Sequence, residues 1–163
     1  MRSPDTCVLT YRRDTITPVL RCKAIICANG QTIEVDAIWD TGASISCISV
    51  SVETQLSLIP IGYTQNYTAG GVTPAQIYYV DIRLTDDIVF EDVRVIDSEI
   101  GAQGLGLLIG MDIISLGDFA VSNYKGRTTF TFRLPSRQKI DFCAQAQVQA
   151  ITGQHGKGKR RNK

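Results

Sequence analysis

Ala37-Ile38-Trp39-Asp40-Thr41-Gly42-Ala43-Ser44 contains the end of an apolar run, a single acid, and then a threonine and a glycine. Asp-Thr also occurs at residues 5–6 and 14–15, but only Asp40-Thr41 follows strand-forming residues and precedes a glycine, which permits a sharp turn. A second apolar segment, residues 44–50, comes directly afterwards. The sequence therefore predicts a strand, a turn that carries an acid, and another strand. An ordinary turn also fits these three residues, since Asp, Thr and Gly are common in turns.

The composition indicates one folded domain. The chain has 163 residues, enough for a single hydrophobic core, and its 44% hydrophobic and 20% charged residues are typical of globular proteins. The net charge of +1 conceals an uneven distribution, because five of the seventeen basic residues lie at the very end. The rest of the chain then has twelve basic and sixteen acidic residues, a net charge of −4.

Neither a membrane segment nor a cysteine framework is indicated. No apolar run approaches the roughly 18 to 20 residues of a membrane span, and the N-terminus lacks the apolar centre of a secretory signal. We therefore expect a cytoplasmic protein that does not contact a membrane. The five cysteines are scattered and His155 is the single histidine, so we expect reduced thiols, no metal and no cofactor.

Strand-forming segments fill most of the chain. Residues 19–28 and 32–40 flank the turn Asn29-Gly30, and residues 76–86 and 88–97 meet at a turn of two aspartates. Three further strands are predicted, and only two short segments favour helix. These strands span residues 106–110, 119–123 and 128–134, and the helices residues 50–58 and 111–117. The fold class is predicted to be all-β.

The end of the chain differs from the rest. From Asp141 onward it is Gln-rich and then basic, so we expect a domain over residues 1–140 and a tail over residues 141–163. A short helix followed by a frayed end would fit this composition. Two explanations of the basic cluster remain open, contacts with nucleic-acid phosphates or a solvated tail that aids solubility.

Three segments in order resemble the retropepsin-like aspartic proteases, the family of retroviral proteases and their cellular and bacterial relatives. They are Asp40-Thr41-Gly42-Ala43, the glycine-containing segment 67–82, and Leu108-Ile109-Gly110-Met111-Asp112. The resemblance spans residues 19–134. It implies a closed β-barrel or sandwich lobe with one short helix after the Leu108–Asp112 segment.

The resemblance also implies a reaction. Two carboxylates pressed together share one proton, so that one takes a proton from water while the other donates a proton to the carbonyl oxygen. The sequence contains only one Asp-Thr-Gly, at Asp40. Hydrolysis by this route therefore requires a homodimer that brings Asp40 and its copy together. The substrate would be an extended peptide or protein.

The active-site loop takes its expected roles from the same resemblance. Thr41 would brace the facing loop across the dimer axis, and Gly42 would let the substrate backbone approach the acids. Ala43 stands where pepsin-like enzymes commonly have a hydroxyl that donates toward the carboxylates and favours their charged form. Because Ala43 lacks that hydroxyl, we expect a weakly acid pH optimum.

A second set of residues is expected to support the site. The family's flap, a hairpin that closes over the peptide, would have its tip at Ala69, Gly70, Gly71 and Val72. Gly-Gly is equally suited to any surface hairpin, so this role depends on the resemblance. The supporting second loop would contain Ile109 and Gly110.

The sequence departs from the retroviral pattern at the dimer contact. Retroviral enzymes often have an acid where Ser44 lies and an arginine where Met111 lies, and these two form an ion pair. Both charges are absent here, and apolar packing can replace such a pair at little cost. Residues 128–134 are the expected intersubunit strand.

Two other functions remain open besides an active homodimeric endopeptidase. The fold could serve as a catalytically silent dimerisation or binding module, because a shared fold does not establish a shared activity. Alternatively, the basic tail could carry the function by contacting nucleic acid while the β domain only supports it. The intact Asp40-Thr41-Gly42 favours the enzyme.

Overall fold

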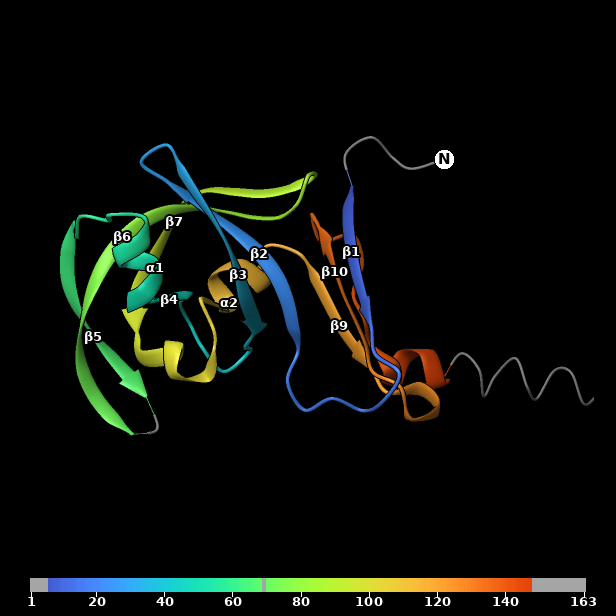
Figure 1. Cartoon of the computed structure of the whole chain (residues 1–163). Helices are drawn as coiled ribbons and strands as arrows, with labels where there is room; N and C mark the ends of the chain where they lie inside the picture. Colours follow the sequence, from blue (N-terminus) through green and yellow to red (C-terminus); the bar gives the residue numbers. More distant parts are fainter. Residues whose placement is uncertain (1–5, 69, 148–163) are drawn as a thin grey trace, which may run out of the picture.

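Strands dominate the computed structural model, which describes residues 6–68 and 70–147 (Figure 1). The strands are β1 (Cys7–Arg12), β2 (Arg21–Ala28), β3 (Gln31–Trp39), β4 (Cys47–Ser49), β5 (Gly62–Thr68), β6 (Gly71–Thr85), β7 (Ile88–Ser98), β8 (Leu107–Ile109), β9 (Asp118–Ser122) and β10 (Thr129–Leu134). The helical elements are short: α1 (Val50–Gln55), α2 (Met111–Ile114) and two 3₁₀ turns, η1 (Glu99–Gln103) and η2 (Tyr124–Gly126).

Six strands close into a barrel. They belong to a seven-stranded sheet with the order β2-β3-β8-β4-β7-β6-β5, and an additional pairing of β2 with β6 closes it. β5 lies outside the closed ring, at the edge of this sheet. The barrel interior is apolar, and Ile26, Ile48 and Ile82 are completely buried. The expected all-β closed barrel is confirmed, and the expected short helix, α2, begins at Met111, inside the Leu108–Asp112 segment and not after it.

Tight turns connect the barrel strands where the sequence contains turn residues. Asn29 and Gly30 both have positive φ, 52° and 71°, and they join β2 to β3 as a two-residue hairpin. Such backbone conformations favour Asn followed by Gly. Lys125 and Gly126 likewise have positive φ, between β9 and β10. Local sequence therefore determines these connections.

The end of β3 is positioned by the neighbouring strand β8, which separates β3 from β4 in the sheet. β8 lies between β3, with which it runs parallel, and β4, with which it runs antiparallel. The chain therefore leaves β3 at Trp39, passes the end of β8 and enters β4 at Cys47. Residues 40–46, called here the active-site loop, form this passage, and they lie beside the start of α2, which follows β8.

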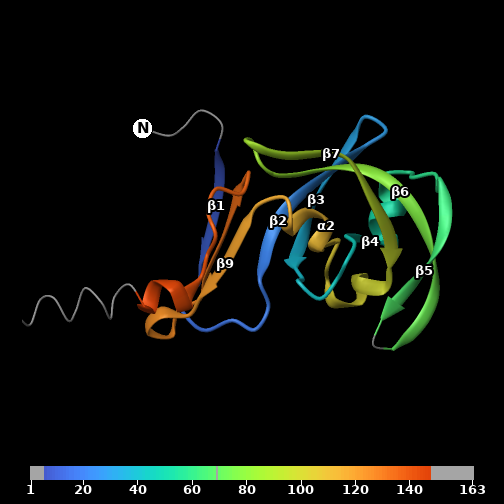
Figure 2. The same ribbon diagram turned by 180° about the vertical axis from the view of Figure 1, so that it is seen from behind.

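A second, three-stranded sheet packs beside the barrel in the order β1-β10-β9 (Figures 1 and 2). β10 is its central strand and pairs with β1 along one edge and β9 along the other. The expectation that residues 128–134 form the intersubunit strand is therefore wrong. β10 cannot accept a strand from a second chain, because both of its edges are already paired.

Aromatic side chains join the two sheets. The ring of Trp39, at the end of β3, stacks on Phe119 of β9 at a centroid distance of 5.1 Å and meets Phe132 of β10 at 5.1 Å. Trp39 is only 6% exposed. Aromatic pairs of this kind contribute roughly 0.5–1.5 kcal/mol beyond the area they bury. Trp39, the residue before Asp40, is thus held by its own strand in the barrel and by ring contacts with the second sheet.

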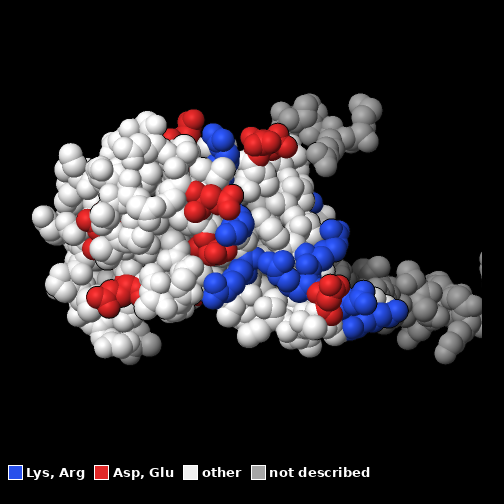
Figure 3. All heavy atoms as spheres, in the orientation of Figure 1, with Lys and Arg blue, Asp and Glu red and all other residues white. Residues whose placement is uncertain are grey.

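The hairpin of β5 and β6 contrasts with this core. No Lys, Arg, Asp or Glu occurs between Thr54 and Val80, and the surface over β5 and β6 is largely uncoloured in the charge view (Figure 3). Exposed apolar side chains on it include Tyr63 and Tyr67, at 77% and 73% exposure. The paired part of the hairpin, residues 62–77, is therefore an uncharged projection from a protein that carries charges elsewhere.

The end of the chain is described only in part. Residues 142–147 are helical, whereas the basic cluster and His155 lie outside the described residues, as does Ala69. Within residues 6–68 and 70–147, no helix is long and apolar enough to cross a membrane.

Candidate active site

Asp40 lies half-buried at the end of β3, where two backbone hydrogen bonds define its position. Its own N–H donates to the carbonyl oxygen of Ile109 at 2.9 Å, which continues the pairing of β3 with β8 by one residue. The N–H of Gly42 donates to Asp40 Oδ1 at 2.8 Å. A backbone donor thus orients the carboxylate.

The active-site loop turns tightly around this carboxylate. The N–H of Ala43 donates to the carbonyl oxygen of Asp40 at 3.2 Å, and the carbonyl oxygen of Ala43 accepts from the N–H of Met111 at 2.8 Å. The second bond ties the loop to the first residue of α2. The structure therefore brings Asp40, Ala43, Ile109 and Gly110 together, while Thr41 and Gly42 lie exposed on the loop.

Asp112 and Ser46 hold the far end of the loop. Asp112 accepts from the Ser46 N–H at 3.0 Å and from its hydroxyl at 2.8 Å, while Ser46 Oγ accepts from the N–H of Gly110 at 3.0 Å. Ser46 is completely buried. Asp112 belongs to the Leu108–Asp112 motif, but neither residue was expected to have a role, because 66 positions separate them in the sequence.

Gly110 permits the close approach of the two segments. A Cβ at position 110 would lie 2.8 Å from both the carbonyl carbon and the oxygen of Ile45. Backbone atoms cannot move aside as a flexible side chain can, so any larger residue would push α2 away from the loop. Gly110 acts by packing, as does Ile109, which is completely buried.

The positions of the retroviral ion pair are both at the surface. Ser44 is exposed and Met111 is 37% exposed. In the described part of the chain, no ion pair involves the active-site loop or α2. The bond from Met111 N–H to Ala43 is therefore a backbone link that does not depend on the side chain at position 111.

The structure places Gly70 and Gly71 at the tip of the β5–β6 hairpin. Gly71 has φ of +122°, which residues with a Cβ rarely adopt, and it pairs with Thr68. The Thr68 hydroxyl accepts from Gly70 N–H at 3.2 Å and donates to the Gly71 carbonyl oxygen at 3.2 Å. Val72 is 53% exposed. These two side-chain hydrogen bonds of the described tip residues are thus internal to the tip.

Cys47, directly after the loop, does not offer an alternative nucleophile. Burial, together with the negative charges of Asp112 and Asp40, raises the pKa of the Cys47 thiol to about 11, so this thiol is neutral at physiological pH. A neutral buried thiol is a poor nucleophile. Among the residues that the structure describes, no group of three or more His, Cys, Asp or Glu could hold a metal ion.

This arrangement favours acid–base chemistry by a carboxylate. Asp40 is accessible to water and oriented by a backbone donor, but a single ionised carboxylate can only accept a proton. Hydrolysis of an amide also needs a proton donor for the carbonyl oxygen. The site in one chain therefore lacks one of the two groups that the reaction requires.

Comparisons with known proteins agree with this geometry. A family model described as aspartyl protease matches residues 24–113, which include β3, the active-site loop, the hairpin and the start of α2. No curated protein sequence matches the chain at a significant level.

A solved structure shares the fold, and two viral proteases are less similar to this chain. A retropepsin-like aspartic protease from Rickettsia conorii superposes with a TM-score of 0.52 at 15% identity, covering 82% of this chain and 99% of its own. The Simian foamy virus (mac) protease gives 0.42 at 21% identity, covering 58% of this chain and 91% of its own. The EIAV protease, solved with an inhibitor, gives 0.45 at 20% identity and covers 60% and 86%.

The family match extends over more than half of the sequence and contains the Asp40-Thr41-Gly42 turn, whose structural setting agrees with the match. The chain therefore belongs to the aspartyl protease family and has the retropepsin-like fold.

Proposed function

We propose that the protein is a homodimeric aspartic endopeptidase in which Asp40 and its copy form the catalytic pair. The observation that carries this proposal is the setting of Asp40, half-buried, accessible and oriented by the Gly42 N–H at 2.8 Å. A symmetric dimer supplies the second carboxylate from the same position of the partner. Thr41, exposed beside Asp40, would contact the facing loop at the axis.

The reaction follows from two carboxylates that share one proton. Two carboxyl groups within hydrogen-bonding distance of each other cannot both be ionised, because their negative charges repel. One Asp40 therefore acts as the base and the other as the acid. The base removes a proton from water, the water oxygen attacks the carbonyl carbon, and the acid protonates the carbonyl oxygen. Proton transfer to the amide nitrogen then allows the C–N bond to break, which releases two peptides.

The substrate would be an extended peptide bound beneath the hairpin. β5 is an edge strand, so its outer edge is available for pairing with an added strand. The tip, including Ala69, Gly70, Gly71 and Val72, would close over the peptide and exclude water. Because the hairpin lacks charge, it favours apolar residues near the cut.

Peptide-library cleavage by the wild type beside Asp40→Asn tests this proposal. Asp40→Asn removes acid–base exchange, so kcat/KM should fall at least about a hundredfold while the circular dichroism spectrum is unchanged. Equal cleavage by both proteins would refute the assignment of Asp40. A folded wild type that cuts no peptide would favour a silent binding module.

A further inference from the structure

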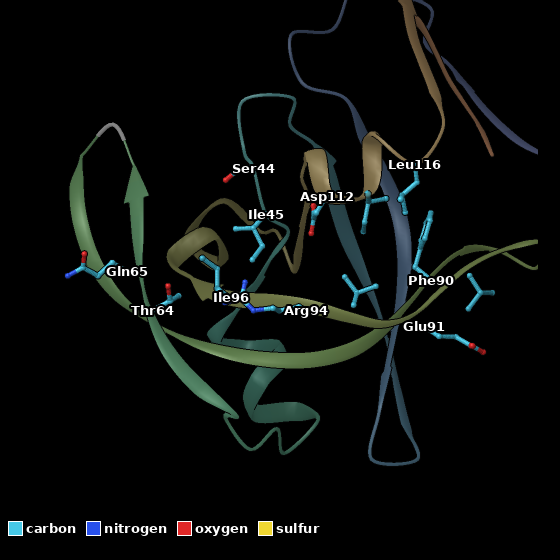
Figure 4. A pocket seen from close by; sticks show the side chains of 13 residues that line it. Ser44, Ile45, Thr64, Gln65, Phe90, Glu91, Arg94, Ile96, Asp112 and Leu116 are labelled. Carbon is cyan, nitrogen blue, oxygen red and sulfur yellow. The ribbon is translucent and has the colours of Figure 1, made fainter. Parts of the chain in front are cut away.

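A groove of about 850 Å³ begins beside the active-site loop (Figure 4). Ser44 and Ile45 of the loop and Thr64 and Gln65 of β5 contribute to its walls. The remaining lining residues come from β7 and the region of α2: Val89, Phe90, Glu91, Val93, Arg94, Ile96, Asp112, Ile113 and Leu116. A volume of this size accommodates a ligand of several peptide residues.

The groove continues the proposed catalytic site without containing it. Asp40 is absent from its lining, whereas Ser44 and Ile45 come four and five positions after Asp40. A peptide that leaves the catalytic carboxylates along the loop would therefore enter the groove. Extended peptide advances about 3.3 Å per residue, so the groove would receive residues a few positions away from the cut.

Arg94 is the only cationic side chain in the lining. It is exposed, and no hydrogen bond or ion pair links it to another residue of the described segments. In Figure 4 it lies on β7 in the middle of the groove, between Thr64 on one side and Asp112 on the other. The guanidinium therefore faces the space where a ligand would lie.

The other charges in the groove are placed differently. Asp112 already accepts two hydrogen bonds from Ser46, at 3.0 and 2.8 Å. Glu91 lies toward the far end, beyond Phe90 (Figure 4). The β5 wall carries no charge, since residues 54–80 contain none. Arg94 is thus the one charged side chain of the lining that attracts an anionic group.

We propose that this groove binds the part of the substrate that lies beyond the scissile bond, and that Arg94 selects an acidic side chain there. This rests on the proposed function, because it names the substrate class of the same site. A guanidinium recognises a carboxylate by two parallel hydrogen bonds, which fixes position as well as charge.

An extended peptide fits the groove better than a small anion. Apolar side chains of β7 flank Arg94, notably Val93 and Ile96, and Leu116, which follows α2, adds apolar surface to the same groove. A small anion would pair with Arg94 and leave this apolar surface in water. A peptide with one acidic residue between apolar residues covers both features, and the burial of apolar area adds to its affinity.

Binding to the Asp40→Asn protein tests the inference without cleavage. The probe is a set of ten-residue fluorescent peptides with an apolar centre, in which each outer position in turn is Glu, Gln or Lys. At one outer position, the peptide with Glu should bind roughly three- to tenfold more tightly than the peptide with Gln, and the peptide with Lys should bind more weakly than both. Added salt should reduce this preference, because the pair is partly exposed.

Charge variants then locate the effect. In Asp40→Asn/Arg94→Glu, the peptide with Lys at that position should bind more tightly than the peptide with Glu. In Asp40→Asn/Arg94→Gln, the Glu and Gln peptides should bind with equal affinity. Asp40→Asn/Arg83→Glu is the matched control, because Arg83 is exposed on β6 outside the groove. It changes the net charge by the same amount and should keep the original order.

The outcomes separate this inference from the proposed function. If no outer position distinguishes Glu from Lys, if no peptide binds, or if the Arg94 and Arg83 variants behave alike, Arg94 does not select an acid. If the preference appears and depends on Arg94 while the wild type cuts no peptide, the inference stands and the enzymatic function fails. Circular dichroism of each variant verifies that it is folded.

Discussion

The active-site loop and the tip of the β5–β6 hairpin are held in opposite ways. Hydrogen bonds reach the loop from elements far along the chain, including Ile109, Met111 and Asp112. Among the described residues of the tip, side-chain hydrogen bonds connect Thr68 with its near neighbours Gly70 and Gly71. The loop also follows a strand, β3, that is paired with β8, whereas Val72 at the tip is 53% exposed.

The difference suits the two tasks that an endopeptidase has to perform. A carboxylate that exchanges protons must stay within a fraction of an ångström of its working position, and long-range bonds provide that precision. An element that admits and covers a polypeptide must open, so it needs few contacts with the rest of the protein. Changes in the loop should therefore affect catalysis and stability together, and changes at the tip catalysis alone.

Asp112→Ala should have the largest effect. It leaves the Ser46 N–H and hydroxyl without their acceptor, and hydrogen bonds to charged groups contribute about 1.5–3 kcal/mol each. We expect about 2–3 kcal/mol less unfolding free energy and about a hundredfold lower kcat/KM, mainly through kcat, because Asp112 positions the loop that carries Asp40.

Asp112→Asn is the matched control for this change. Its amide oxygen still accepts one of the two hydrogen bonds from Ser46. The losses in unfolding free energy and in kcat/KM should therefore both be smaller than for Asp112→Ala. Urea unfolding and steady-state kinetics measure the two quantities. Wild-type kcat in a folded Asp112→Ala protein would contradict the proposed rigidity of the loop.

Gly71→Ala should have an intermediate effect, confined to the hairpin. A Cβ at position 71 meets no atom within 4 Å, so the cost comes only from φ of +122°. Strain of about 1–2 kcal/mol at the tip corresponds to a loss in kcat/KM of about tenfold. The midpoint of urea unfolding should change little, because the tip is outside the core.

Gly70→Ala provides the comparison. Its added Cβ would lie 3.6 Å from Thr68 Oγ1, an ordinary contact, and its φ is outside the positive range. The kcat/KM of this variant should remain close to wild type. If both alanine variants lose the same activity, backbone strain at Gly71 is not the cause.

Asp118→Asn should have the smallest effect on activity and should change only stability. Asp118, in β9, accepts from the Ser136 hydroxyl, the Arg137 N–H and the Arg133 guanidinium, and these bonds hold the pKa of its carboxyl well below the usual range. A lowered pKa stabilises the folded state above the unfolded pKa of about 4, and this contribution is lost as pH falls through the folded pKa.

The stability loss of Asp118→Asn should therefore be large at neutral pH and should shrink progressively below about pH 4. Urea midpoints at several pH values measure it, with kcat/KM as the control. A pH-independent difference would show that the hydrogen bonds, and not the charge, account for the loss.

Local signals were sufficient for most of the fold. Asn29-Gly30 and Lys125-Gly126 fix their turns through positive φ, and the apolar run before Asp40 forms β3. Such features depend on residues near one another in the sequence, so sequence analysis can predict them. The family resemblance added the order of segments that identified the closed barrel.

Long-range pairing accounts for what sequence analysis missed. The paired residues of β1 and β10 lie between 117 and 127 positions apart (Arg12↔Thr129 to Cys7↔Leu134), so nothing local indicated that β10 is a central strand unavailable to a second subunit. The bonds between Ser46 and Asp112 are missed for the same reason. The groove containing Arg94 is formed by four separate segments, which only the folded chain brings together.

Subunit mixing tests the central claim, that two Asp40 carboxylates from separate chains act as one catalytic pair. Wild-type protein at fixed concentration is equilibrated with increasing amounts of Asp40→Asn, and cleavage of a reference peptide is measured. Mixed dimers contain one carboxylate and should be inactive, so an equal amount of Asp40→Asn should reduce activity to about one half and a ninefold excess to about one tenth. Activity that stays constant at every ratio would show that a single chain suffices, and would contradict the account.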